Sequence, residues 1–222
     1  METLVRTEEQ EELSSPHRTE YPLESVEIRP HRMYLALKRG MDILLAVFVG
    51  LLLLLPMLII ALIIKIDSPG PALFKQDRMG KGGKVFTIYK FRSMRMDAPS
   101  EMASREFVDS RAYITRFGAF IRRTSLDELP QLINVLNGTM SFVGYRPVCL
   151  TEVELNALRK EYGVFAIRPG LTGLAQVSGR DNVSARDKAQ IDAEYLSKCG
   201  IKMDLRCLLK TITVVFSGEG VM

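Results

Sequence analysis

The chain of 222 residues has no tryptophan, only two histidines and only three cysteines. Both histidines, His17 and His31, precede the long hydrophobic segment described below, so the sequence after that segment cannot supply a Ser-His-Asp triad. The number of cysteines is odd and the sequence has no Cys-x-x-Cys pair, because the three lie at Cys149, Cys199 and Cys207. This argues against a disulfide framework and against a zinc site. Catalysis there has to rely on carboxylates, lysine, tyrosine or hydroxyl groups, in a compartment that we expect to be reducing.

Charge is absent from one long stretch. From Ile43 to Ile64 there are 22 residues without charge and without Ser, Thr, Asn or Gln. As a helix this stretch would be roughly 33 Å long, enough for a hydrocarbon core of about 30 Å. The pattern therefore predicts a membrane-inserted helix, in preference to a buried core helix or a cleaved signal peptide.

The insertion mode of this helix follows from its flanks and from Pro56. Lysine and arginine lie on both sides of the stretch, so the positive-inside rule gives no direction for a single span. Pro56 removes an N–H and frees the carbonyl of Leu52, which favours a sharp bend. We expect a re-entrant helix with both ends in the cytoplasm, and a kinked spanning helix is the alternative.

Charge and hydropathy divide the chain into three predicted segments. Residues 1–30, with three Arg and eight Glu (net −5), are an acidic tail that we expect to be disordered. Residues 31–66 are the re-entrant membrane helix with its basic flank, and residues 67–222 are a cytoplasmic catalytic domain. The chain after residue 30 has 27 Lys plus Arg against 18 acids (net +9). Beside a membrane, this balance favours anionic lipid or phosphorylated substrates over nucleic acid.

The body is predicted to be α+β, mostly helical, with a short β-hairpin. Strands are expected at residues 73–78 and 84–94, joined by residues 79–83. Two basic amphipathic helices are expected, over residues 111–123 and around residues 202–215. Each could lie in the lipid headgroup layer or pack on the core, and the neighbouring membrane insertion favours the interfacial position.

The densest chemical cluster is an acidic pair, Asp127 and Glu128, next to Arg122. Its spacing leaves two interpretations open. In the first, the helix that follows is simply well capped, by Asp127 as N-cap or by Ser125 and Glu128 as a capping box. In the second, carboxylates at the positive end of a helix dipole stay ionised and attack phosphorus or hold Mg²⁺.

Two further segments, residues 144–147 and 168–180, combine glycine with arginine. We expect loops whose backbone approaches a ligand while guanidinium groups grip phosphate, with ordinary surface turns as the alternative.

Four stretches give the sequence a more specific likeness. They are KRGMD at 38–42, DSPGPALFKQDRMGKGGKVFTIYKFRSM at 67–94, RRTSLDELPQLINVLNGTMSFVGYRP at 122–147 and RPGLTGLAQVSGR at 168–180. With these stretches the chain, from residue 38 to 216, resembles the small monotopic phosphoglycosyl transferases, also called bacterial sugar transferases.

The resemblance implies transfer of a sugar 1-phosphate from a UDP-sugar to polyprenyl (undecaprenyl) phosphate, with release of UMP, as the first membrane step of glycan or polysaccharide assembly. Asp127 would form a covalent phosphosugar intermediate, Glu128 would be its partner, and the pair would hold Mg²⁺. The enzyme would sit on the inner leaflet of the bacterial inner membrane, with its catalytic domain facing the cytoplasm.

The resemblance also implies substrate-binding residues. Those for the diphosphate or the acceptor phosphate are Lys90, Arg122 and Arg146. Those facing the nucleotide are Arg168, Gln176 and Arg180. Two positions depart from the family pattern: Leu55 replaces a common Ser before the membrane-helix proline, and Tyr145 replaces a common Pro beside Arg146.

Two other functions remain as alternatives at this point. One is a noncatalytic membrane adaptor that binds anionic lipid through its basic helices, although an adaptor has no need of adjacent acids in a basic cluster. The other is an integral transferase that joins both substrates in a ternary complex, although such enzymes usually have many membrane spans.

Overall fold

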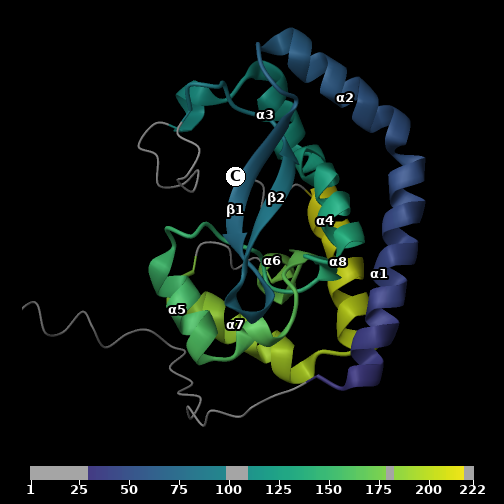
Figure 1. Cartoon of the computed structure of the whole chain (residues 1–222), viewed down its shortest axis with the longest axis vertical. Coiled ribbons are helices and arrows are strands. Elements are labelled where there is room, and N and C mark those ends of the chain that lie inside the picture. Colours follow the sequence, from purple (N-terminus) through teal and green to yellow (C-terminus); the bar gives the residue numbers. More distant parts are fainter. Residues whose placement is uncertain (1–29, 99–109, 179–182, 218–222) are drawn as a thin grey trace, which may run out of the picture.

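The computed structural model of the chain describes residues 30–98, 110–178 and 183–217 (Figure 1). The predicted tail, residues 1–30, lies outside these residues except for Pro30. The α-helices are α1 (Arg32–Leu52), α2 (Leu54–Asp67), α3 (Arg116–Arg123), α4 (Leu132–Asn137), α5 (Val153–Glu161), α6 (Leu174–Val177), α7 (Ala185–Lys198) and α8 (Ile201–Ser217). The strands are β1 (Leu73–Met79), β2 (Val85–Phe91), β3 (Ser141–Val143) and β4 (Gly170–Thr172). Short 3-10 helices are η1 (Lys81–Gly83), η3 (Ser110–Tyr113), η4 (Leu126–Gln131) and η5 (Val164–Ala166). A mostly helical structure with a short antiparallel hairpin is therefore confirmed.

The hydrophobic segment forms two helices, α1 and α2, whose axes are bent by 63° at Leu53 (Figure 1). Pro56 lies in the first turn of α2, where it cannot donate a hydrogen bond to the carbonyl of Leu52. In the described part of the chain, no single helix is long and apolar enough to cross a membrane, whereas this bent pair is when its two helices are taken together.

Asp42 and Arg39 are two of the residues that fasten helix α1 to the body. Asp42, which is buried, accepts hydrogen bonds through Oδ1 from the Ser141 hydroxyl and the Phe142 N–H, both at 3.1 Å. Arg39 donates to the carbonyls of Val135 and Leu136 at the end of α4. Because carbonyls at a helix C-terminus lack intrahelical partners, Arg39 also satisfies α4.

Helix α2 is fastened at its exit from the segment. Arg92 follows β2 and donates to the carbonyls of Ser68 and Pro69, at 2.6 and 2.7 Å. Arg92 is 5% exposed, so these bonds are shielded from water. Beside them, Ile60 and Ile64 of α2 pack in a buried cluster that includes Phe91.

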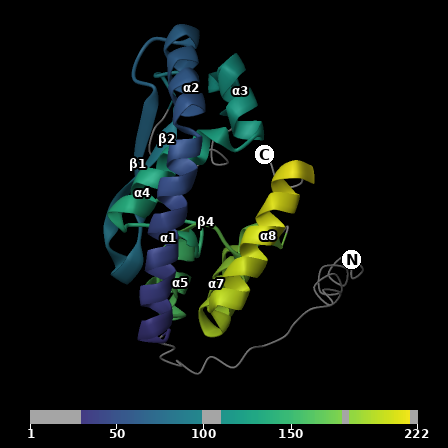
Figure 2. The same ribbon diagram turned by 90° about the vertical axis from the view of Figure 1, so that its right-hand side faces the viewer.

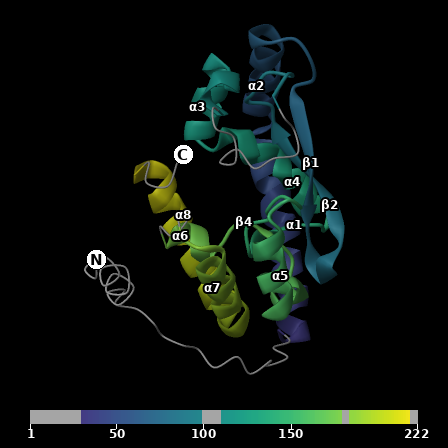
Figure 3. The ribbon, with the colours of Figure 1, turned by 90° about the vertical axis from the view of Figure 1, so that its left-hand side faces the viewer.

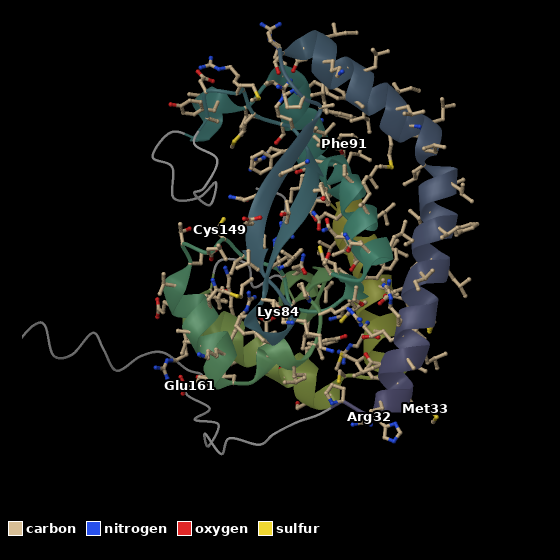
Figure 4. The ribbon with its side chains drawn as sticks, viewed as in Figure 1. Arg32, Met33, Lys84, Phe91, Cys149 and Glu161 are labelled. Atoms are coloured by element: carbon tan, nitrogen blue, oxygen red, sulfur yellow. The ribbon has the colours of Figure 1, made fainter. Side chains whose placement is uncertain are left out.

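The predicted hairpin is confirmed, with small changes at its ends. Strand β1 pairs antiparallel with β2 from Leu73 opposite Phe91 to Met79 opposite Val85. The second strand is shorter than predicted and ends at Phe91, which Figure 4 labels. The connection turns through Gly82 and Gly83, both at φ 69°, a conformation that favours glycine.

The prediction of a loop over residues 168–180 is wrong for much of that range, because residues 170–172 form β4 and residues 174–177 form α6. Strand β4 pairs parallel with β3. A Cβ on Gly170 would lie 2.2 Å from the Gly144 nitrogen, and one on Gly173 would lie 1.9 Å from the Gly144 oxygen. These glycines therefore let backbone pack against backbone, whereas the sequence had suggested approach to a ligand.

The first amphipathic helix is shorter than predicted. It begins at Arg116 because the Thr115 side chain accepts a hydrogen bond from the Gly118 N–H at 2.9 Å, while Ile114 forms an isolated bridge with Met94. Ile121 is fully buried, so one face of α3 packs on the core.

The second amphipathic helix is α8. It lies on the opposite side of the molecule from the hairpin (Figures 2 and 3). Leu205, Leu209 and Ile212 are exposed on it, whereas Cys207 is fully buried.

The Arg92 contacts give a testable prediction. Arg92→Lys keeps the charge but cannot reach both carbonyls with a planar fork. We expect a loss of about 2 kcal/mol, seen as a fall of roughly 4–8 °C in the thermal unfolding midpoint in detergent. Arg95→Lys is the matched control, because Arg95 pairs with Asp97 on the exposed surface. Equal midpoints for the two variants would contradict a structural role for Arg92.

Candidate functional site

The acidic pair lies within a 3-10 helix, and neither predicted cap is present. Asp127 and Glu128 are inside η4, so Asp127 is not an N-cap. Ser125 precedes η4 in the left-handed region (φ 55°), and its side chain makes no capping hydrogen bond. The Ser125 carbonyl instead accepts from the Glu128 N–H at 3.2 Å. Both carboxylates are therefore left for other contacts.

A buried asparagine positions this helix against the hairpin. Asn134, in α4, is 1% exposed. Its Oδ1 accepts from the Tyr89 N–H at 3.0 Å, and its Nδ2 donates to the Thr87 carbonyl at 2.7 Å. The amide thus bonds to β2 as a neighbouring strand would, and it holds α4 and η4 against the strand that carries Lys90.

Glu128 is the centre of an ion-pair cluster. Its Oε1 lies 2.8 Å from Lys90 Nζ and 3.0 Å from Arg146 Nη2. Burial opposes ionisation, but the charges of Arg146 and Lys90 outweigh burial and lower the pKa of Glu128 to about 2. At neutral pH Glu128 is therefore a fixed anion that orients two cations.

Asp127 has a different environment from its neighbour. Burial raises the pKa of Asp127, Lys90 opposes this change, and the charge of Glu128 adds to it. Within the part of the chain that the structure describes, no hydrogen bond reaches the Asp127 carboxylate. Adjacent carboxylates with pKa values shifted in opposite directions are typical of sites where the two have separate roles. An unbonded carboxylate beside cations can act as a nucleophile toward phosphorus or as a metal ligand.

A hollow of about 280 Å³ opens beside this cluster. Its lining residues are Arg78, Ile88, Lys90, Glu128, Gln131, Arg146, Pro147, Gly170 and Leu171. Three of these side chains are cationic and one is a carboxylate, so the lining carries an excess of positive charge.

Tyr145, the departure from the family pattern, does not line this hollow. It is 1% exposed and packs edge-on against Phe165, with ring centroids 5.6 Å apart. Its carbonyl accepts from the Gly170 N–H at 2.9 Å, which extends the β3–β4 pairing. Arg146 follows Tyr145 directly and lines the hollow, so the tyrosine anchors the segment that carries Arg146.

The remaining predicted site residues are spread over the body. Arg122, in the last turn of α3, carries a charge that opposes the rise that burial causes in the pKa of Asp127. Gln176 donates to the Leu171 carbonyl at 3.2 Å. Arg180 lies outside the described residues.

Arg168 lies apart from the acidic pair. Its Nε donates to the Gly138 carbonyl at 2.7 Å, and its side chain lines a second hollow of about 370 Å³ with Lys38 and Asp42. The structure thus brings Lys90, Glu128 and Arg146 together and keeps Arg168 at a different surface. The roles assigned to all these residues stay predictions.

Two polar side chains of the first hollow, those of Arg78 and Gln131, were not predicted as site residues. The hairpin register could have indicated Arg78. Side chains two apart on a strand share a face, so Lys90, opposite Phe74, lies on the same face as Arg78, opposite Phe86. Gln131 carries no comparable signal, because its position depends on η4 being a 3-10 helix.

The acidic pair is the candidate for binding a metal. Within the described ranges, no group of three or more His, Cys, Asp or Glu side chains could hold an ion. Mg²⁺ nevertheless uses only one or two carboxylates when substrate phosphates and water supply its other ligands. Asp127 and Glu128 therefore fit a Mg²⁺ ion that is shared with a phosphorylated substrate.

Comparison with known proteins identifies similar sequences. A family model described as bacterial sugar transferase matches residues 33–218. The chain is 42% identical over 190 residues to the exopolysaccharide production protein PSS of Rhizobium leguminosarum bv. phaseoli, covering 81% of this chain and 95% of that protein. It is 41% identical over 184 residues to a UDP-glucose:undecaprenyl-phosphate glucose-1-phosphate transferase of Caulobacter vibrioides, covering 79% and 68%. It is 42% identical over 163 residues to the galactosyl transferase CpsE of Streptococcus agalactiae serotype III, covering 68% of this chain. The chain spans only 36% of the length of this last relative.

The ion-pair cluster predicts a pH-dependent contribution to stability. The pKa of Glu128 in the folded chain, about 2, is below its unfolded value of about 4.3. The stabilisation is therefore present above about pH 4.3 and is lost as pH falls toward 2. We expect Glu128→Gln to lower the thermal unfolding midpoint at pH 7, and the difference from the unmodified chain to shrink at pH 3. Glu194→Gln, at an exposed pair with Lys198, is the control. A difference that is the same at both pH values would refute this coupling.

Proposed function

The chain belongs to the bacterial sugar transferase family, and from this membership we propose that it transfers a sugar 1-phosphate from a UDP-sugar to undecaprenyl phosphate and releases UMP. Relatives that are named for this reaction, such as the Caulobacter vibrioides protein, support the substrate class. The observation that carries the proposal is the unbonded Asp127 carboxylate, next to a Glu128 that orients Lys90 and Arg146. Both substrates are anionic, which matches the cationic lining of the hollow.

In the proposed first half-reaction, a carboxylate oxygen of Asp127 attacks the phosphorus that bears the sugar. A bond forms between that oxygen and the phosphorus, and the bond from the phosphorus to the bridging oxygen breaks. UMP leaves with the electron pair of the broken bond. Lys90, Arg146 and Arg122 are close enough to Asp127 to act on its charge, so they can also neutralise charge on the phosphate groups.

In the second half-reaction, a phosphate oxygen of undecaprenyl phosphate attacks the same phosphorus. The Asp127 carboxylate then leaves, which regenerates the enzyme and forms a diphosphate linkage between sugar and lipid. Glu128 keeps its charge throughout, since its pKa of about 2 leaves it ionised at neutral pH. Its role is to hold the two cations in place.

Mg²⁺ is part of the proposal. Asp127 and Glu128 would hold it, and the ion would supply further neutralisation of the diphosphate charge. Lys90 and Arg146 already contact Glu128 Oε1, so the cations of the chain and the metal would act on the same group of phosphate oxygens.

The membrane placement is likewise proposed. We place α1 and α2 as a re-entrant pair in the inner leaflet of the bacterial inner membrane, with the body in the cytoplasm. The 63° bend and the exposed apolar side chains of Leu44, Leu55 and Leu62 support this placement. The exposed leucines of α8 would then meet lipid, and nucleic acid is not among the expected partners.

The covalent step gives the central test. Covalent catalysis separates the two half-reactions, so UMP should appear in a stoichiometric burst without undecaprenyl phosphate. Asp127→Asn removes the nucleophile and should abolish the burst, with a loss of turnover on the order of 10³-fold or more. UMP release is measured with Mg²⁺ and a panel of UDP-sugars.

The matched control is Asp77→Asn. Asp77 lies exposed on β1, where its carboxylate accepts from the Thr87 hydroxyl at 2.8 Å, so this variant should keep the burst. Mass spectrometry should map the trapped sugar phosphate to Asp127. A burst in Asp127→Asn would refute the nucleophile. A ternary-complex mechanism predicts no UMP until the lipid is added, and a noncatalytic adaptor predicts none at all.

The re-entrant placement is tested with single cysteines. In a variant without the three native cysteines, His31→Cys and Asp67→Cys place one thiol before α1 and one at the end of α2. Both sites are exposed. We expect both thiols to be protected from an impermeant reagent in intact cells and labelled in opened cells. Labelling of only one site in intact cells would show that the helix pair spans the membrane.

A further inference from the structure

Two polar side chains of the cationic hollow have no part in the mechanism described so far. Arg78 comes from β1 and Gln131 from the end of η4, and both line the hollow with Lys90, Glu128 and Arg146. Cys149, labelled in Figure 4, forms an isolated antiparallel bridge with Arg78 and so fixes the backbone at this end of the hollow.

Arg78 has donor capacity that the described residues leave unused. Its Nη2 donates to Gln76 Oε1, and its Nη1 is 3.5 Å from the Pro147 carbonyl. Its buried Nε has no hydrogen-bond partner. Burial lowers the pKa of Arg78, and the neighbouring charge of Arg146 acts in the same direction. A partly buried guanidinium beside a second guanidinium is costly unless an anion joins them.

Gln131 lines the same hollow with a side-chain amide. It is only 2% exposed, and no hydrogen bond reaches its side-chain amide from the described residues. Buried side-chain polar groups are nearly always hydrogen-bonded, because leaving one unbonded costs roughly 1–3 kcal/mol. An amide at the wall of a hollow can bond instead to a ligand that enters it.

Arg122 and Arg78, at the two ends of the group of cationic side chains around the acidic pair, have different neighbours. Arg122 acts on the charge of Asp127, the proposed nucleophile. Arg78 lies at the other end, where its charge interacts with Arg146 and Glu128. A ligand bound at Arg78 would therefore sit beside the reacting group, on the side of Glu128.

We propose that Arg78 and Gln131 form a second phosphate subsite in this hollow, which holds a phosphate group that is not being attacked. This inference rests on the proposed function. A planar guanidinium can donate two parallel hydrogen bonds to phosphate oxygens, and the Gln131 amide can donate a third. The group held there is either the uridine-bearing phosphate of the donor or the phosphate of the lipid acceptor.

The test separates these two sources by steady-state kinetics with Mg²⁺. The variants are Arg78→Lys, which keeps the charge, and Gln131→Met, which keeps the shape without the amide. A donor subsite should raise the KM for UDP-sugar about tenfold or more and weaken the UMP burst. An acceptor subsite should raise the KM for undecaprenyl phosphate by a similar factor and leave the burst unchanged. The control is Lys75→Gln, on the same strand but outside the hollow, which should leave both constants unchanged.

A direct binding measurement completes the test. UMP and inorganic phosphate, each added alone, should raise the thermal unfolding midpoint of the unmodified chain, and Arg78→Lys and Gln131→Met should reduce the rise from at least one of them. Both KM values within twofold of the unmodified enzyme, together with unchanged midpoint shifts, would overturn the subsite even if kcat fell. If the unmodified chain releases no UMP from any UDP-sugar, the proposed function fails, and the midpoint shifts still decide whether the subsite binds phosphate.

Discussion

The site depends on the two hydrogen bonds of one buried amide. Asn134 bonds to the backbone of Thr87 and Tyr89, so α4 is joined to β2 by the kind of contact that usually joins two strands. Both the 3-10 helix with the acidic pair and the strand with Lys90 take their positions from this contact. Together with the packing of Leu129 in the cluster that contains Phe91, this contact brings Lys90 of the hairpin to 2.8 Å from Glu128, 38 residues later. The ion pairs of the site therefore depend on neutral groups.

The sequence predicted those features that local periodicity or a long apolar run determines. The hairpin from Leu73 and the break near Pro56 both appear in the structure. Local patterns could not predict η4, because the spacing of Ser125, Asp127 and Glu128 suits an α-helical cap equally well. Only packing against β2 decides between an α-helical cap and the 3-10 helix.

The glycines near the site are a second feature that local sequence patterns did not explain. Glycine next to arginine suggested a phosphate-binding loop, but Gly144, Gly170 and Gly173 are required by the close approach of two backbone segments. That approach needs long-range contacts, which spacing along the chain does not reveal. Family resemblance indicated the acidic pair and Arg146, while Arg78 and Gln131 appear only when the hairpin register and the fold are known.

The hydrogen bonds from Arg92 to the end of the helix pair have a mechanical consequence. Lys90 and Arg92 are two residues apart on one backbone, and Arg92 bonds to the carbonyls of Ser68 and Pro69, the two residues that directly follow α2. A tilt of α2 must either break those buried bonds or be passed through a two-residue connection to the lysine that contacts Glu128. The helix pair and the ion-pair cluster around Glu128 are therefore mechanically coupled. In the membrane placement proposed above, bilayer thickness would set the angle of these helices and, through Arg92, act on the position of Lys90.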